Sequence, residues 1–165
     1  MKKIEWATYE SGDILDWEDK VDVIGHQVNC FGVMGGGLAL QIANKWPEVE
    51  TEYKRYINSF TDHGLRKYLL GECQVVPIPK SRCSIANLFG QYDMGKGLRT
   101  NYHALSKSLD DLRQFIICYE LNKLALPVNL GCGLAGGDWN IVQNLIEKCF
   151  EGSGIEVILV EYKPI

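Results

Sequence analysis

The chain has 165 residues, of which 46% are hydrophobic and 23% charged, a balance typical of one globular domain, expected to span 1–165, with a substantial core. Its formal net charge of −4 argues against a general nucleic-acid binder, although cationic residues recur at Arg99, Lys107 and the pair Lys80 and Arg82. No apolar stretch is long enough to span a bilayer, and residues 1–6 lack the apolar segment of a secretory signal, so we expect a cytoplasmic protein that binds no membrane.

Strand and helix patterns alternate along the chain without a linker between them. In chain order they predict an edge strand at 4–9, a buried strand at 21–28, a helix at 38–45, a second helix from Pro47, a strand pair at 73–78 and 83–89, an amphipathic helix at 100–118, a strand at 124–129, a helix at 138–150 and a closing strand at 156–162. This alternation predicts an α/β fold, a three-layer α/β/α sandwich with a mixed, mostly parallel central sheet.

Two glycine-dense loops, residues 32–37 and 131–137, each follow a predicted strand and precede a predicted helix. Glycine lets backbone N–H groups come close to a ligand, and a helix N-terminus adds positive potential, so such loops suit phosphate or another anion. Both loops, together with the segment 86–91, leave the carboxyl ends of predicted strands, where parallel sheets bind ligands. We therefore expect them to converge on one crevice.

The sequence argues against several common kinds of site. Gly131, Gly133 and Gly136 spell G-x-G-x-x-G, but only one helix and one strand follow, which is too little chain for a dinucleotide fold. The cysteines are scattered, without metal-ligand spacing, so we expect no metal and no cofactor, and thiols that are reduced and mostly buried. They are Cys30, Cys73, Cys83, Cys118, Cys132 and Cys149.

On three motifs in order, the chain resembles the macrodomains, a family of ADP-ribose-binding αβα modules. The motifs are Gly12-Asp13-Ile14, then Val28-Asn29 with the glycines of the first loop, then the second loop. The resemblance implies that Asp13 accepts a hydrogen bond from adenine, that Asn29 addresses the distal ribose and that the second loop takes the diphosphate. It implies these ligand-binding residues: Asp13, Ile14, Asn29, Gly35, Gly36, Gly37, Gln91, Gly131, Cys132, Gly133, Leu134 and Ala135.

The segment around the first loop is similar to the ADP-ribose 1''-phosphate phosphatase branch of that family. It carries His26, Asn29 and Cys30, then the three glycines, then Trp46-Pro47. This resemblance implies catalytic roles for His26 and Asn29 in hydrolysis of ADP-ribose 1''-phosphate. Physically, loop amides can hold phosphoryl oxygens, a histidine of ordinary pKa can orient or deprotonate water, and an amide can hold sugar hydroxyls.

The second loop also resembles the glycohydrolases that remove terminal ADP-ribose from proteins. Gln91 and Ala135 stand where those enzymes have a lysine and an aspartate, which weighs against their covalent mechanism. The alternatives are a non-catalytic ADP-ribose reader, a hydrolase acting on ADP-ribosylated protein or O-acetyl-ADP-ribose, and an NAD-binding protein outside the family. Structural roles also stay open: His26 as a core residue, Asn29 and Asp13 in turns, and Asp138 as a helix cap.

Overall fold

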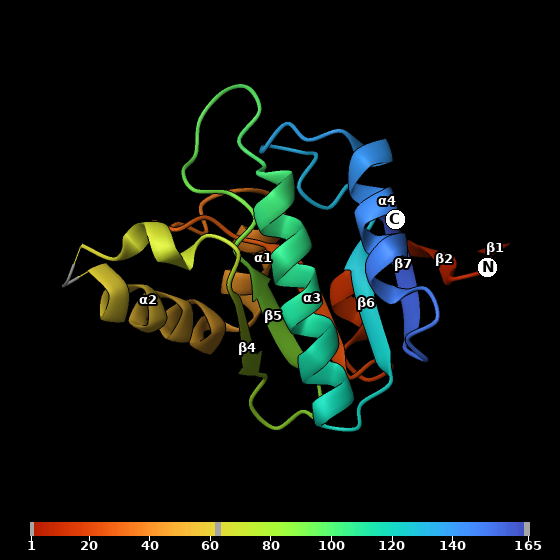
Figure 1. Ribbon diagram of the computed structural model, residues 1–165. Coiled ribbons are helices and arrows are strands. Elements are labelled where there is room, and N and C mark those ends of the chain that lie inside the picture. Colours follow the sequence, from red (N-terminus) through yellow and green to blue (C-terminus); the bar gives the residue numbers. More distant parts are fainter. Residues whose placement is uncertain (1, 62–63, 164–165) are drawn as a thin grey trace.

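The computed structural model describes residues 2–61 and 64–163, and these form a seven-stranded sheet of order β1-β2-β7-β6-β3-β5-β4 (Figure 1). The strands are β1 (Lys2–Lys3), β2 (Ala7–Gly12), β3 (Val23–Gln27), β4 (Cys73–Pro77), β5 (Ser84–Leu88), β6 (Lys123–Pro127) and β7 (Glu156–Tyr162). The helices are α1 (Gly37–Lys45), α2 (Pro47–Thr61), α3 (Tyr102–Cys118) and α4 (Trp139–Phe150), with short 3-10 turns η1 (Ile14–Trp17) and η2 (Arg66–Leu69). The five inner strands are parallel and the two outer ones antiparallel to their neighbours, which confirms the mixed, mostly parallel sheet.

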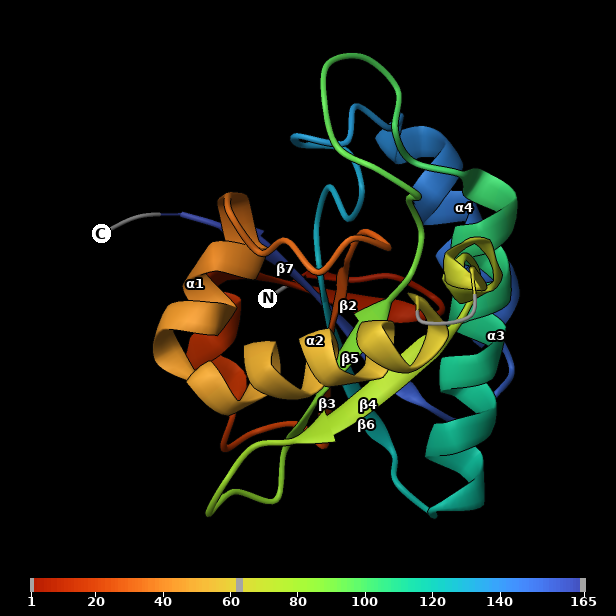
Figure 2. The same ribbon diagram turned by 90° about the vertical axis from the view of Figure 1, so that its left-hand side faces the viewer.

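The sheet is covered on both faces, because alternate residues of the inner strands point to opposite sides. Ile24 of β3 and Val160 of β7 join a buried cluster with α1 and α2, whereas Val23 and Leu159 join a second cluster with α3 and α4. Figure 2 shows these helix pairs on opposite sides of the sheet. Strands buried on both faces read as continuous apolar runs, which is why the buried strands were recognisable in the sequence. The three-layer prediction is confirmed.

The first predicted strand is wrong in position and in its edge location. The chain turns at residues 4–7, where the Ile4 N–H donates to the Ala7 carbonyl oxygen at 2.9 Å. β2 therefore begins at Ala7, pairs in parallel with β7 and is covered on its other side by β1. An apolar–polar alternation cannot distinguish a strand from the turn that precedes it, and this error shifted the boundary by three residues.

The starts of the helices bear directly on the site. Asn101 caps α3 through a hydrogen bond from Ala104 N–H to its Oδ1 (3.0 Å), and Asp138 caps α4 by accepting from Asn140 N–H (2.9 Å). The predicted capping role of Asp138 is thus confirmed. In contrast, α1 begins behind Gly36 with no side-chain cap. Its first-turn N–H groups are therefore available to an external acceptor.

Within residues 2–61 and 64–163, no helix is both long and apolar enough to cross a bilayer.

Candidate functional site

Three loops lie together at the carboxyl edge of the parallel strands: residues 28–36, 89–101 and 128–138. The first two are joined by a hydrogen bond from Cys30 N–H to the Tyr92 carbonyl (2.9 Å), and the last two by one from Arg99 N–H to the Ala135 carbonyl (2.8 Å). Figure 2 shows loops 89–101 and 128–138 rising on the same side of the sheet. The predicted convergence of these segments is therefore seen in the fold.

The two glycine loops touch each other. A Cβ built on Gly36 would lie 2.8 Å from the Leu134 Cδ1 atom, so the Leu134 side chain packs directly against the first loop. Leu134 is nevertheless 78% exposed, since it stands on the outer surface of the second loop. This contact brings the two glycine loops side by side.

Backbone donors are left over on both loops. Within the described residues, the amides of Gly35 and Gly36 on the first loop donate to no protein acceptor, and neither do those of residues 133–135 on the second. The uncapped N-terminus of α1 adds positive potential beside the first set. At the second loop the Asp138 carboxylate already caps α4, so anion binding there depends on the loop amides alone.

Gln27, the last residue of β3, links the three loops through a network of side-chain hydrogen bonds. Its Nε2 donates to Gln91 Oε1 at 3.0 Å and to Thr100 Oγ1 at 2.9 Å, and the Thr100 hydroxyl donates to the Gly131 carbonyl at 2.6 Å. Gln91 in turn donates to the Asp93 carbonyl at 2.9 Å. The Gln91 side chain, predicted to bind ligand, is thus engaged in this inter-loop network. Direct ligand contact by Gln91 stays a prediction.

Asn29 organises the first loop. Its Oδ1 accepts from Phe31 N–H at 2.9 Å and from the Tyr53 hydroxyl at 3.0 Å, and its Nδ2 donates to the Val33 carbonyl at 2.8 Å. The side chain is buried, with 6% of the residue exposed. These bonds confirm the turn-forming role, and they leave one Nδ2 proton without an acceptor among the described residues. Ribose binding by Asn29 stays a prediction.

His26 lies inside the layer between the sheet and α2. It is 2% exposed, and its Nε2 lies 2.6 Å from Asn87 Oδ1, an acceptor, so Nε2 carries the proton. Its Nδ1 has no partner among the described residues. Burial lowers the pKa of His26 to about 4, against a smaller opposing effect of the Asn87 hydrogen bond, and the ring is neutral near pH 7. This geometry supports a core histidine; catalysis by His26 stays a prediction.

The loop cysteines are not activated nucleophiles. Burial raises the pKa of Cys30 to about 12 and that of Cys132 to about 11, where the Asp138 carboxylate adds to the effect. Both thiols are therefore protonated near neutral pH. All six cysteines are free, but only Cys30 and Cys83 are buried, which corrects the expectation that most of them are. Cys118 is exposed at the end of α3, and the other three, Cys73, Cys132 and Cys149, are partly exposed.

Asp13 and Ile14 follow β2 at the same edge of the sheet. Asp13 Oδ1 accepts from Leu15 N–H at 2.9 Å and so starts η1, and Ile14 is buried against the sheet. The alternative role of Asp13 in a turn is therefore confirmed. The other carboxylate oxygen, Oδ2, accepts no hydrogen bond from the described residues and is available to an amino group.

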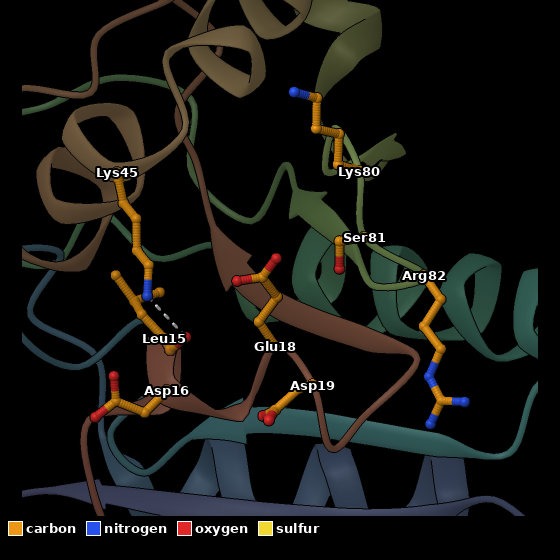
Figure 3. A pocket seen from close by; sticks show the side chains of 8 residues that line it. All are labelled: Leu15, Asp16, Glu18, Asp19, Lys45, Lys80, Ser81 and Arg82. Carbon is orange, nitrogen blue, oxygen red and sulfur yellow. Dashed lines mark hydrogen bonds between the residues drawn. The ribbon is translucent and has the colours of Figure 1, made fainter.

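A separate hollow of about 510 Å³ lies away from the loops, near the amino end of β5 (Figure 3). It is lined by cations of α1 and of the β4–β5 turn and by acids from the segment around η1, which are Lys45, Lys80, Arg82, Asp16, Glu18 and Asp19. Lys45 donates to the Leu15 carbonyl at 3.2 Å. No predicted ligand-binding residue lines this hollow, and Lys107 lies elsewhere, beside Glu72 and Asp111. The recurring cations therefore do not form one patch.

Two arrangements of side chains near the site were not predicted from the sequence, although Tyr92 itself is an aromatic residue that could stack on an adenine or ribose. Gln27 and Thr100 join the loops, and Phe31 and Tyr92 form an exposed ring pair beside Asn29. The polar Gln27 at the end of the largely apolar β3 was the available signal, whereas no local pattern indicates that Phe31 and Tyr92 meet. Among the described residues, no group of three or more His, Cys, Asp or Glu side chains is placed to hold a metal ion.

Several solved structures that share this fold are macrodomains. The macrodomain of Mycobacterium tuberculosis DarG is 27% identical, with a TM-score of 0.76, and the match covers 96% of this chain and 98% of that one. Thermosipho africanus DarTG, solved in complex with ADP-ribose, has the same fold, with a TM-score of 0.76 at 20% identity, over 96% of this chain and 43% of that one. The chain therefore has the fold of the macrodomains, to which these neighbours belong.

Curated relatives are named for ADP-ribose chemistry. The ADP-ribose 1''-phosphate phosphatase of Saccharomyces cerevisiae is 31% identical over 66% of this chain and 60% of that protein. The DNA ADP-ribosyl glycohydrolase of Mycobacterium tuberculosis is 29% identical over 87% of this chain and 38% of that protein. An uncharacterised 17.5 kDa protein of Enterobacteria phage T4 is 27% identical over 95% of this chain and 97% of its own length. The chain thus spans less than two thirds of the two named enzymes. No protein-family model matches the chain.

Proposed function

We propose that this macrodomain binds ADP-ribose at the carboxyl edge of its sheet, with the diphosphate held between the two glycine loops. The observation that carries the proposal is the pair of facing loops with unpaired amides, at Gly35 and Gly36 on one side and residues 133–135 on the other. Backbone amides and an uncapped helix N-terminus are a common phosphate site. The macrodomain relative solved with ADP-ribose supports this ligand.

The two ends of the ligand are assigned by neighbouring residues. Adenine would lie near Ile14 and donate its amino hydrogen to the free Oδ2 atom of Asp13. The distal ribose would lie beside Asn29, whose remaining Nδ2 proton can meet a hydroxyl oxygen. Gly37, Gly131 and Cys132 would contribute loop backbone rather than side-chain chemistry.

We propose further that the chain hydrolyses a bond at the distal ribose C1'' position, in the cytoplasm, where six free cysteines are expected. The first candidate is ADP-ribose 1''-phosphate: water adds to phosphorus, the P–O bond breaks, and ADP-ribose leaves with the 1''-hydroxyl. A named relative with this activity supports it. If His26 is catalytic, His26→Gln should lower turnover and leave ADP-ribose affinity unchanged.

A second candidate is a glycohydrolase acting on an ADP-ribosylated macromolecule, the activity for which a relative is named. The burial of His26 weighs against its use as a general base in the phosphatase reaction. In the glycohydrolase reaction the C1'' bond to the modified group breaks and water supplies the new hydroxyl. The reader function predicts tight ADP-ribose binding without turnover of any of these compounds.

A substrate panel with purified protein tests the proposal. Calorimetry with ADP-ribose and with NAD measures ligand preference, and product release is followed from ADP-ribose 1''-phosphate, O-acetyl-ADP-ribose, ADP-ribosylated protein and ADP-ribosylated DNA. We expect ADP-ribose to bind more tightly than NAD and one substrate to turn over. Tighter binding of NAD would refute the site, and phosphate release no greater than a buffer blank would refute the first candidate.

A further inference from the structure

Tyr53 lies on α2 and reaches the first glycine loop from inside the fold, where α2 runs past that loop (Figure 2). The residue is 0% exposed, and its hydroxyl donates to the main-chain carbonyl of Asn29 at 2.6 Å and to Asn29 Oδ1 at 3.0 Å. A phenol has one proton, which these two acceptors share. Burial raises the pKa of Tyr53 above its usual value, so the hydroxyl stays protonated near neutral pH. Tyr53 therefore fastens both the main chain and the side chain of Asn29 to α2.

The main-chain carbonyl of Asn29 depends on this phenol. Among residues 2–61 and 64–163, its oxygen accepts a hydrogen bond only from Tyr53. A buried carbonyl that loses its donor is costly, so without the hydroxyl the peptide group after Asn29 would rotate toward another donor or toward water. Because the carbonyl and the side chain are joined at one Cα atom, that rotation would also move the Asn29 carboxamide.

The hydrogen bonds of the Asn29 carboxamide leave it one way to contact a ligand. Its Oδ1 is surrounded by three donors, which are the Phe31 N–H at 2.9 Å, the Val33 N–H at 3.3 Å and the Tyr53 hydroxyl. An amide oxygen has two lone pairs, so Oδ1 has no capacity left for a ligand hydroxyl. Nδ2 donates one proton to the Val33 carbonyl at 2.8 Å and keeps the other. Asn29 thus offers a ligand a donor and no acceptor.

We propose that Tyr53 is a positioning residue of the distal-ribose subsite, which holds Asn29 so that its remaining Nδ2 proton is directed at a ribose oxygen. The inference rests on the proposed ADP-ribose site and adds to it a residue that acts through Asn29, since a fully buried phenol does not reach the ligand. The unpaired amides of Gly35 and Gly36 receive no bond from Tyr53. Diphosphate binding should therefore not depend on the phenol.

The test compares ADP-ribose with ADP, which keeps the adenine and the diphosphate but lacks the distal ribose, by calorimetry. Tyr53→Phe removes only the hydroxyl. It should weaken ADP-ribose binding on the order of tenfold, the effect of one misplaced hydrogen bond, and change ADP binding less than about twofold. Tyr56→Phe is the matched control on the same helix. Its ring also lies 5.9 Å from the Phe89 ring, and its hydroxyl bonds to none of the described residues, so it should change neither affinity.

A double-mutant cycle asks whether Tyr53 acts through Asn29. In an Asn29→Ala background, Tyr53→Phe should change the ratio of ADP-ribose affinity to ADP affinity less than about twofold, because the coupled partner is gone. A further tenfold loss there would overturn the inference. Equal weakening of ADP and ADP-ribose by Tyr53→Phe alone would also overturn it, because the phenol would then support the whole loop. Unchanged affinity for both ligands would do the same.

A measurement on the wild-type protein does not depend on whether the variants fold. In ¹⁵N-labelled protein, one Nδ2 proton of Asn29 should shift on addition of ADP-ribose and neither should shift with ADP, while the proton bonded to Val33 stays in place. Saturation with ADP-ribose without a shift at Asn29 would overturn the inference alone. Failure of the wild-type protein to bind ADP-ribose would overturn the proposed function and the inference together. Thermal melting checks that each variant is folded.

Discussion

The buried His26 should make the fold sensitive to acid. In the folded state its pKa is lowered to about 4, mainly by burial, from the usual 6.5. Between these two pH values the unfolded chain binds a proton that the folded chain does not. The free energy of unfolding should therefore decrease as pH falls from about 6.5 to about 4. The stabilisation that the neutral ring provides is fully present above pH 6.5.

The size of the effect follows from the two pKa values. The difference between 6.5 and about 4 corresponds to about 3 kcal/mol of unfolding free energy for a ring with no access to solvent. In a domain of this length that loss lowers the melting temperature by roughly 10 °C. Substituting His26→Gln removes the titration while keeping an amide donor for Asn87 Oδ1. The variant should thus lose much of the dependence of stability on pH.

The assay is urea unfolding at a series of pH values between 7 and 4.5, followed by circular dichroism. The matched control is His103→Gln, at an exposed histidine on α3. This variant should show the same change of unfolding free energy with pH as the wild-type protein. The change of unfolding free energy with pH is informative even if His26→Gln lowers stability at every pH. If the variant and the wild-type protein lose stability in parallel as pH falls, His26 is not the neutral, buried group described above, and the reasoning is refuted.

Three further substitutions test the loops. Asn29→Ala should cost about 1–3 kcal/mol of unfolding free energy, because buried loop groups lose their partner, and should also weaken ADP-ribose binding; denaturant unfolding and calorimetry measure both. Gln27→Leu should raise the KM for the active substrate more than it changes kcat, because it disconnects Gln91 and Thr100; an unchanged KM would contradict the bridging role. Gly136→Ala should lower thermal stability, since its Cβ would lie 2.6 Å from the Gly97 carbonyl oxygen at a backbone φ of +72°; an unchanged melting temperature would exclude this clash.

Much of the fold could be predicted because its signals are local. Pro47 separates α1 from α2, Asp138 starts α4, and apolar runs bounded by glycine mark the buried parallel strands. Residues 4–9 were misread because their alternation continues through the turn before Ala7. The order of the strands, which puts β1 outside β2, depends on pairings between distant segments that no local pattern specifies.

The candidate site was predicted less completely than the fold. The glycine loops could be predicted because a glycine-rich composition by itself indicates accessible backbone amides. The environments of His26 and Asn29 were not, because Asn87 and Tyr53, which determine them, lie 61 and 24 residues away in the chain. Similarly, the Phe31–Tyr92 contact exists only once the loops after β3 and β5 lie side by side. Position in a motif identified these residues, and only tertiary contacts defined what each side chain can do.

The most direct test of the ADP-ribose site is amide NMR of the ¹⁵N-labelled protein during titration with ADP-ribose. We expect the amide protons of Gly35 and Gly36, and those of residues 133–135, to shift strongly as they gain phosphate acceptors. Amides of Lys80, Ser81 and Arg82 at the separate hollow should stay unchanged. Shifts confined to that hollow, or saturation without change in either glycine loop, would refute the proposed ADP-ribose site.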